Sequence, residues 1–241
     1  MRGSREFKQE PGIVIVGLGP AGANLLTREA WEWFNSLSEV YLRTAFHPCV
    51  GELPTRLEVH SFDDVYEQEE SLAAVLAEIS QRVLQLGRRP GGVTYGVPGS
   101  PWVAEETTVQ ILAAAKEEGL PVRVIDGMSF VEPVCAALGI DPSAKLFFVD
   151  ALHLADRYVP SFPPSYGALI SQITAGMPLS EVKLTLMSNY PDEYPVRLVH
   201  AAGTNQQEVE ELPLYALDHS PKVGLLSTLY IPPWEENRSF E

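Results

Sequence analysis

The first half of the chain alternates short apolar runs with longer stretches in which apolar residues recur at helical spacing. Ile13–Val16 is a run of β-branched residues followed by glycine, which is typical of a buried strand. From Leu72 to Val83 apolar side chains recur about every 3.6 residues, which predicts an amphipathic helix. The same patterns predict further strands at 40–43, 92–97 and 122–125 and further helices at about 27–37, 104–117 and 129–138. Because strands alternate with helices, we expect a mostly parallel sheet covered on both faces.

After Asp141 strand-like segments dominate the pattern. They lie at 146–150, 167–174, 196–202, 214–217 and 223–231, with one helix predicted at about 179–188. This change predicts a second, α+β lobe built on a mixed sheet. We therefore expect an α/β protein with an N-terminal lobe at 12–127 and a C-terminal lobe at 128–233. A disordered leader at 1–11 and a polar tail at 234–241 are predicted to flank them.

The charge balance narrows the classes of partner. The chain has 32 aspartate and glutamate residues against 17 lysine and arginine residues, a formal net charge of −15. Such a surface repels nucleic-acid phosphates and anionic membranes, so we expect neither as a partner. Its two cysteines, Cys49 and Cys135, show no metal-ligand spacing, and no apolar run approaches the roughly 18 residues of a membrane span. These features predict a cytoplasmic protein with reduced thiols and no bound metal.

The first glycine-rich turn is ambiguous. Gly17-Leu18-Gly19-Pro20-Ala21-Gly22 follows a predicted strand and matches the G-x-G-x-x-G pattern of dinucleotide-binding turns. In such a turn the third glycine lies inside the helix, whose N-terminus meets the pyrophosphate. Here the predicted N-cap is Thr27, five residues after Gly22. The second strand ends in Arg43 instead of an acidic residue, and an arginine suits the 2′-phosphate of NADP, so NADP binding stays open as an alternative.

Two further glycine turns follow predicted strands. In Tyr95-Gly96-Val97-Pro98-Gly99-Ser100-Pro101, Gly99 permits a positive φ or the close approach of a ligand, and the prolines stiffen both sides. Asp126-Gly127-Met128-Ser129 ends the next strand in the same way. Ligands of open α/β sheets bind at the carboxyl ends of the strands. We therefore expect the three turns to line one crevice for a small molecule.

Taken in order, these segments resemble the tetrapyrrole (corrin/porphyrin) methylase family, and more closely the methylase-like N-terminal domain of MazG-type proteins. The resemblance covers about residues 12–233. Besides the three turns, it rests on Arg43-Thr44, His47-Pro48, Phe62–Tyr66, Val103–Glu105, Val182–Met187, Tyr190–Tyr194, Ala201–Gly203 and Leu229–Pro233.

The resemblance implies two α/β lobes with S-adenosylmethionine in a cleft between them, a homodimer, and methyl transfer to a small-molecule acceptor such as a tetrapyrrole. S-adenosylhomocysteine is then the product. Carried over by position, the cofactor-binding residues are Pro20, Pro98, Gly99, Ser100, Val103, Ser129, Phe130, Gln172, Ala201, Ala202 and Thr228. Arg43, Tyr66 and Trp102 are candidates for the substrate cleft. Because the cofactor carries the activated methyl group, the protein mainly orients the acceptor, and no catalytic side chain is assigned.

The chain departs from the family in the second turn. Tetrapyrrole methylases proper have Gly-Asp-Pro where this chain has Gly99-Ser100-Pro101, so a carboxylate partner for the cationic cofactor is missing. This departure favours a second hypothesis, a non-catalytic ligand-binding and dimerisation module that regulates a fused MazG-type nucleotide pyrophosphohydrolase. We expect that domain to follow in the natural protein. A related branch that methylates peptide-backbone amides shares the ending Tyr230–Pro233, but residues 61–80 lack the arginine on which that branch relies.

Overall fold

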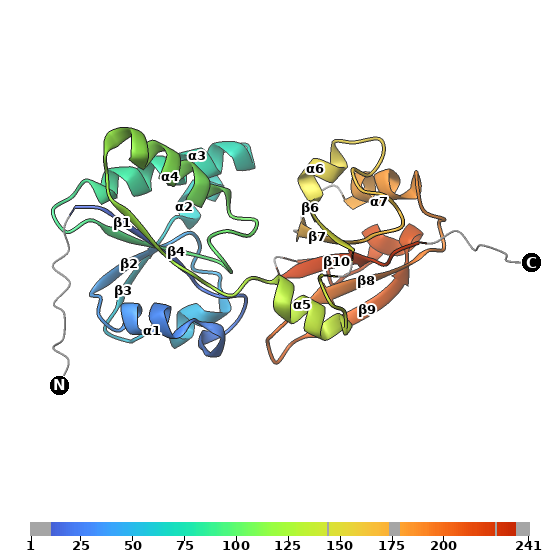
Figure 1. Cartoon of the computed structure of the whole chain (residues 1–241), viewed down its shortest axis with the longest axis horizontal. Coiled ribbons are helices and arrows are strands. Elements are labelled where there is room, and N and C mark those ends of the chain that lie inside the picture. The colour runs from blue at the N-terminus through green and yellow to red at the C-terminus, as the bar shows by residue number, and fades with distance from the viewer. Residues whose placement is uncertain (1–10, 144, 174–178, 225, 235–241) are drawn as a thin grey trace, which may run out of the picture. The chain divides into compact units, whose positions relative to one another are not determined.

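The structure is a computed structural model that describes residues 11–143, 145–173, 179–224 and 226–234. The predicted leader, apart from Pro11, and the tail after Trp234 lie outside these residues. So do Thr174, at the end of one predicted strand, and Leu225, inside another. The chain divides into two compact units, Met1–Phe130 and Val131–Glu241, here called the N-terminal and C-terminal units (Figure 1).

The N-terminal unit is built on a five-stranded parallel sheet. Its strands are β1 (Ile13–Gly17), β2 (Glu39–Leu42), β3 (Glu58–Ser61), β4 (Val93–Val97) and β5 (Val122–Ile125). They lie in the order β3-β2-β4-β1-β5, and each neighbouring pair is parallel, which confirms the predicted sheet. The sequence pattern missed β3. This strand lies at the edge of the sheet, and none of its residues is fully buried, so it lacks the apolar run by which the other strands are detected.

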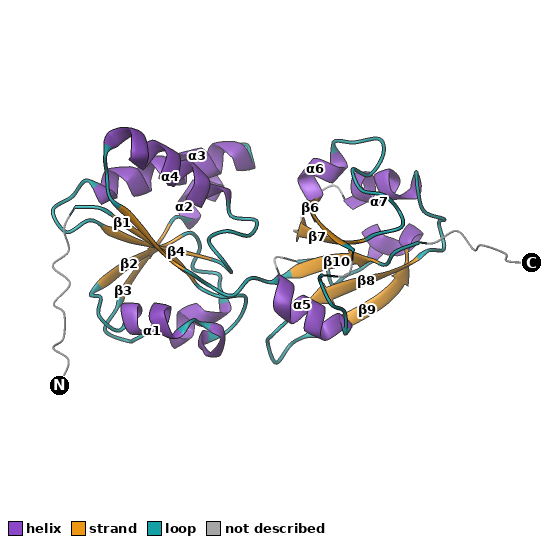
Figure 2. Ribbon diagram, viewed as in Figure 1, coloured by secondary structure: helices purple, strands orange, loops and turns teal. Residues whose placement is uncertain are grey.

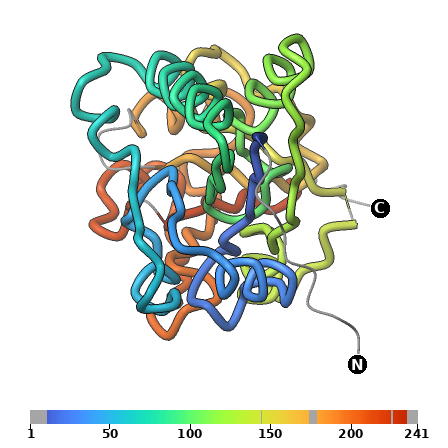
Figure 3. Tube along the Cα trace, turned by 90° about the vertical axis from the view of Figure 1, so that its left-hand side faces the viewer, coloured from blue at the N-terminus to red at the C-terminus, as the bar shows by residue number. Residues whose placement is uncertain are grey.

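Helices cover both faces of this sheet (Figures 2 and 3). On one face lie α2 (Asp63–Gln68), α3 (Leu72–Gly87) and α4 (Glu106–Glu118), and on the other lies α1 (Arg28–Phe34) with the short 3-10 helices η1 (Ala23–Leu25) and η2 (Pro48–Glu52). Successive residues of β1 point to opposite faces, so Ile15 packs in the core under α3 and α4, whereas Val16 packs in the core beside α1. None of the described helices is both long and apolar enough to cross a membrane.

The C-terminal unit contains a mixed five-stranded sheet, as predicted. Its strands are β6 (Leu146–Asp150), β7 (Gly167–Ile173), β8 (Pro195–His200), β9 (Glu208–Pro213) and β10 (Ser227–Ile231), in the order β6-β7-β10-β8-β9. The pair β6–β7 is parallel and the other pairs are antiparallel. The described helices of this unit are α5 (Val131–Leu138), α6 (Ala151–Ala155), α7 (Leu179–Met187) and the 3-10 helix η3 (Leu214–His219).

Two strand predictions in this unit need correction. The prediction of a strand at 214–217 is wrong, because these residues form part of the 3-10 helix η3. The strand of this region is β9, which precedes η3 and ends at Pro213. In β9 only Leu212 is buried, so glutamates mask the apolar signal. The strand expected from 223 begins only at Ser227, where pairing with β7 and β8 starts.

Candidate cofactor-binding site

The three glycine turns meet at the carboxyl edge of the N-terminal sheet. β1 lies between β4 and β5, so the ends of these strands are neighbours. The backbone amides of Gly19 and Gly99 each donate to the carbonyl oxygen of the other, at 3.1 and 2.8 Å. A Cβ atom on Gly127 would lie 2.3 Å from the Gly99 carbonyl oxygen and 2.7 Å from the Gly17 Cα. The expected convergence of the turns is therefore confirmed.

The glycines of these turns serve different ends. Gly17 and Gly127 are required by the packing of backbone on backbone, since a Cβ on either would lie within 2.7 Å of a neighbouring turn. Gly99 has a φ of +67°, and the nearest atom to a Cβ placed there is the Met128 carbonyl oxygen at 4.0 Å. The protein thus fills the space beside two glycines and leaves the space beside Gly99 open.

The first turn does not have the geometry of a dinucleotide-binding helix. Gly22 precedes η1, and α1 begins only at Arg28, with Thr27 as the N-cap. The Thr27 hydroxyl accepts a hydrogen bond from the Ala30 amide and donates one to the Asp126 carbonyl oxygen, both at 3.1 Å. The predicted N-cap is confirmed, and it ties α1 to the third turn instead of presenting a helix N-terminus behind Gly22. The NADP alternative therefore loses its geometric basis.

Side chains also tie the second turn to the third. The Ser100 hydroxyl accepts a hydrogen bond from the Trp102 amide at 3.2 Å, which fixes a tight turn. The Trp102 indole is about half exposed, and its Nε1 donates to Oδ1 of Asp126 at 2.8 Å. Trp102, predicted as a cleft residue, therefore spans from one glycine turn to the other at the exposed edge of the unit.

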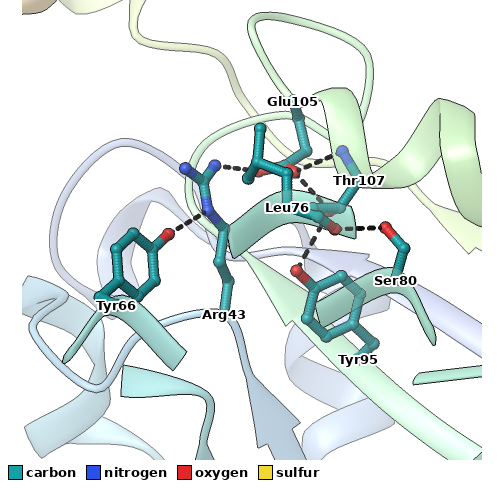
Figure 4. Close-up of polar contacts among 7 residues, drawn as sticks. All are labelled: Arg43, Tyr66, Leu76, Ser80, Tyr95, Glu105 and Thr107. Carbon is teal, nitrogen blue, oxygen red and sulfur yellow. Dashed lines mark hydrogen bonds and ion pairs between the residues drawn. The ribbon is translucent and has the colours of Figure 1, made fainter. Parts of the chain in front are cut away.

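Arg43 and Tyr66, the other two cleft candidates, lie together in a polar cluster with Glu105 (Figure 4). Nη1 of Arg43 contacts Oε2 of Glu105 at 2.6 Å, and Nε donates to the Tyr66 hydroxyl at 2.9 Å. Thr107 completes the cluster, because its amide and hydroxyl donate to Glu105 and its hydroxyl contacts the Tyr95 hydroxyl at 3.1 Å. Arg43 follows β2, Tyr66 lies on α2 after β3, and Glu105 follows β4, so the cluster stands on the same carboxyl edge as the glycine turns.

The cluster is buried but electrically balanced. Only 13% of the Arg43 side chain and 1% of the Glu105 side chain are exposed. Burial by itself lowers the pKa of Arg43, but Glu105, Tyr66 and Tyr95 together more than offset burial and hold that pKa above its ordinary value. Burial likewise raises the pKa of Tyr95 well above its ordinary value. Arg43 is therefore a fixed cation, and its third nitrogen, Nη2, has no hydrogen bond to a residue that the structure describes.

A buried histidine supports the first turn from behind. His47 caps η2, its Nδ1 lies 3.1 Å from the Cys49 sulfur, and its ring is hydrogen bonded to the Gly19 backbone. Burial lowers the pKa of His47 to about 4 and raises that of the Cys49 thiol to about 12. Both groups are therefore neutral at physiological pH, so the His47 ring contacts the Gly19 backbone without placing a charge beside it.

The cofactor-binding candidates divide between the two units. In the N-terminal unit, they lie in or directly after the three turns: Pro20, Pro98, Gly99, Ser100, Val103, Ser129 and Phe130. In the C-terminal unit, Gln172 near the end of β7, Thr228 near the start of β10 and Ala201 directly after β8 share one end of the sheet, because Ser227 pairs with both Ile173 and His200. Ala202 is the next residue and is buried.

Two residues with positive φ, Gln172 and Ala201, lie at the end of the C-terminal sheet where β7 and β8 end. Four described residues other than glycine have positive φ: Ala104, Lys145, Gln172 and Ala201. Gln172 (+63°) and Ala201 (+49°) are cofactor-binding candidates, and Ala104 (+55°) adjoins a third, Val103. Such conformations cost about 1–3 kcal/mol each and concentrate at functional sites. The strain was invisible in the sequence, because alanine and glutamine give no signal of left-handed backbone.

Sequence reasoning missed the two acidic residues of the N-terminal site. The sequence pattern assigns no role to Glu105, although it lies in a segment shared with the family, and it marks Asp126 only as the start of the third turn. The available signal for Glu105 was its position before α4, since an acidic residue there caps the helix. Its partner Arg43 lies 62 residues away in the chain, and no local pattern reveals such a pair.

The fold is that of an α/β protein whose three glycine turns meet at the carboxyl edge of a parallel sheet, the edge at which ligands of such folds bind. A sequence profile of the tetrapyrrole (corrin/porphyrin) methylases matches residues 12–218. The chain belongs to this family, which confirms the resemblance stated above.

Named relatives agree with this assignment. The uncharacterized protein YabN of Bacillus subtilis is 35% identical over 227 residues, which cover 94% of this chain and 46% of that protein. A methyltransferase and borosin cyclic-peptide precursor of Coprinopsis marcescibilis is 25% identical over 260 residues. The aligned region covers 92% of this chain and 62% of that protein. The chain thus spans about half the length of its curated relatives.

A solved structure shares the fold. Uroporphyrin-III C-methyltransferase from Thermus thermophilus, crystallised with S-adenosylhomocysteine, has a TM-score of 0.64 and 16% identity, with 92% of each chain covered.

Proposed function

We propose that the protein is an S-adenosylmethionine-dependent methyltransferase that acts on a small-molecule acceptor, with a tetrapyrrole as the default class. Family membership supports the cofactor, and the Thermus relative was crystallised with the demethylated form of that cofactor. The bound cofactor supplies an activated methyl group, so the chain has to bind it, exclude water and orient the acceptor.

The observation that carries the proposal is the open side of Gly99. This residue stands at the carboxyl edge of the sheet, has positive φ, and is held by two backbone hydrogen bonds to Gly19. Its neighbours Gly17 and Gly127 have their Cβ space filled by backbone, so the free space beside Gly99 is not a general property of the turns. A ligand that lies flat against the backbone fits this cradle, and a side chain there would exclude it.

The Arg43 cluster is proposed to orient the acceptor. Glu105 fixes the guanidinium, and Nη2 is left to bind an anionic group such as a carboxylate. Because the Tyr66 oxygen accepts from Arg43, its own proton is directed away from Arg43 and is available to an acceptor oxygen or nitrogen. Trp102, also on this edge, is proposed to line the acceptor's entrance.

The remaining candidates in the C-terminal unit, Gln172, Ala201, Ala202 and Thr228, are proposed to contact the adenosine part of the cofactor. Their shared position at one end of the sheet and the strained backbone of Gln172 and Ala201 support this. The homodimer and the cytoplasmic location implied above stay predictions. Sedimentation of the purified chain tests the first of them.

A matched pair of glycine variants tests the binding proposal. Gly99 and Gly119 have nearly the same φ, +67° and +69°, and a Cβ on either has no atom closer than 4.0 Å. Alanine at either position should therefore destabilise the fold by a similar amount, about 1 kcal/mol. Gly119 caps α4 at its C-terminal end and lies in no glycine turn. Only Gly99→Ala should weaken S-adenosylmethionine binding in calorimetry, by about tenfold or more.

Two results would count against the proposal. If the parent protein releases no heat with either S-adenosylmethionine or S-adenosylhomocysteine, it does not bind the cofactor. If it binds but Gly99→Ala and Gly119→Ala have equal affinities, the Gly99 turn is not the wall of the site. Formation of S-adenosylhomocysteine in the presence of a tetrapyrrole acceptor then tests catalysis separately.

A second candidate function is a non-catalytic module that binds the cofactor and regulates a fused pyrophosphohydrolase. Ser100 supports it, because the hydroxyl is engaged with the Trp102 amide and supplies no charge to the site. The relative YabN is about twice as long as the aligned region, which leaves room for a further domain. This function predicts binding without turnover, and changed hydrolase kinetics when S-adenosylmethionine is added to the full-length protein. Accumulation of a methylated product would contradict it.

A further inference from the structure

The second turn has no carboxylate, but the third turn places one next to it. By the family resemblance, Ser100 occupies the position of an aspartate in the tetrapyrrole methylases proper. Asp126, at the start of the third turn, reaches toward the second turn, and its Oδ1 accepts the Trp102 indole hydrogen at 2.8 Å. Its main-chain oxygen is fixed independently by the Thr27 hydroxyl at 3.1 Å. The carboxylate is therefore held by both its backbone and its side chain.

The Asp126 carboxylate has no cationic partner among the described residues. Its Oδ2 accepts no hydrogen bond from these described residues either. Glu105, the other acid near the second turn, is neutralised by Arg43 and almost completely buried. Asp126 is exposed at the same edge as the open side of Gly99, where Met128 of its own turn provides the nearest atom.

The indole adds a second element of cation recognition. Trp102 is 56% exposed although its nitrogen is hydrogen bonded, so an indole face is available to a ligand. Aromatic faces attract cations, most strongly those of tryptophan, and a neighbouring carboxylate reinforces the attraction. A carboxylate and an indole that share a hydrogen bond form a rigid unit, which loses little freedom when a ligand binds.

We propose that Asp126 and Trp102 form the cation-binding element of the cofactor site, and that they take over the role of the aspartate missing at position 100. The chemical class that they recognise is the cationic methionine end of S-adenosylmethionine, which carries a sulfonium and an ammonium group. This inference rests on the proposed function and adds a specificity-determining pair to it.

Asp126→Asn separates the charge from the structural role. Asparagine keeps an oxygen that accepts the Trp102 indole hydrogen, but it carries no charge. The probes are S-adenosylmethionine and 5′-methylthioadenosine, a neutral thioether without the amino-acid end. Glu117→Gln is the control, because Glu117 is exposed near the C-terminal end of α4 and its loss changes the net charge equally.

Calorimetry of the parent and the two variants gives distinct outcomes. Asp126→Asn should weaken S-adenosylmethionine binding by about tenfold or more, leave 5′-methylthioadenosine binding within about twofold, and reduce the salt dependence of the former. Glu117→Gln should change neither affinity. An equal loss for both probes would show a structural role and overturn the inference, as would unchanged S-adenosylmethionine binding in Asp126→Asn. Absence of binding by the parent protein is different, since it removes the proposed function itself.

Discussion

Removing the charge of Glu105 should destabilise the N-terminal unit far more than its position at a helix terminus suggests. Glu105→Gln keeps an oxygen for the Thr107 amide, so the cap of α4 survives. The substitution leaves the Arg43 guanidinium, 13% exposed, without its carboxylate partner at 2.6 Å. Loss of one partner of a buried ion pair costs about 3–5 kcal/mol. Because Arg43 keeps its bond to Tyr66, we expect a loss of about 3 kcal/mol.

The double variant shows whether the cost comes from the orphaned charge. Arg43→Gln with Glu105→Gln removes both charges and should be more stable than Glu105→Gln alone, by about 1 kcal/mol or more. Glu117→Gln, at an exposed site, should stay within about 0.5 kcal/mol of the parent.

Urea unfolding followed by tryptophan fluorescence measures these differences. In a Trp234→Phe background, the remaining tryptophans, Trp31, Trp33 and Trp102, all belong to the N-terminal unit, so the signal reports on that unit. The reasoning fails if Glu105→Gln loses less than about 1 kcal/mol, or if the double variant is no more stable than the single one.

Three further predictions concern the glycine turns and the buried residues behind them. Gly127→Ala should destabilise the protein by about 3 kcal/mol or more in urea unfolding, because its Cβ would lie 2.3 Å from a backbone oxygen. Gly119→Ala, whose Cβ lies in open space, should destabilise it by only about 1 kcal/mol. Equal losses of stability would contradict the packing argument. His47 has a pKa of about 4 in the fold against an ordinary 6.5, so only the unfolded chain takes up its proton as the pH falls between these values. The contribution of His47 to the free energy of unfolding should therefore fall by about 3 kcal/mol across that window and stay constant below it. His47→Gln should abolish this contribution, and a parallel pH dependence of variant and parent would refute it. Cys49 and Cys135 are both buried, and burial raises the pKa of Cys49 to about 12, so neither should react with a disulfide reagent at pH 8 until the protein unfolds; rapid labelling of one thiol would be inconsistent with this burial.

The sequence predicted those parts of the fold in which local pattern and burial coincide. β1 is a β-branched run because both of its faces pack in a core, and α3 shows its buried stripe at helical spacing. The pattern failed for β3 and β9, which lie at the edges of their sheets and bury almost none of their residues, none in β3 and Leu212 alone in β9. An edge strand is held by backbone hydrogen bonds on one side, and these leave no signature in side-chain hydrophobicity.

In the candidate site too, local pattern predicted the glycine turns, but it did not show why each turn needs a glycine. A glycine after a strand is a single signal in the sequence, yet it has two physical causes. At Gly17 and Gly127 the cause is backbone packing, and any side chain would separate the turns. At Gly99 the cause is positive φ beside open space. Only the second kind leaves room for a ligand, so the turns that look alike in sequence divide into two that build the edge of the sheet and one with open space beside its backbone. The polar contacts around that opening join residues far apart in the chain, Arg43 with Glu105 and Trp102 with Asp126. These contacts follow from the strand order, which brings the ends of separate strands to one edge of the sheet.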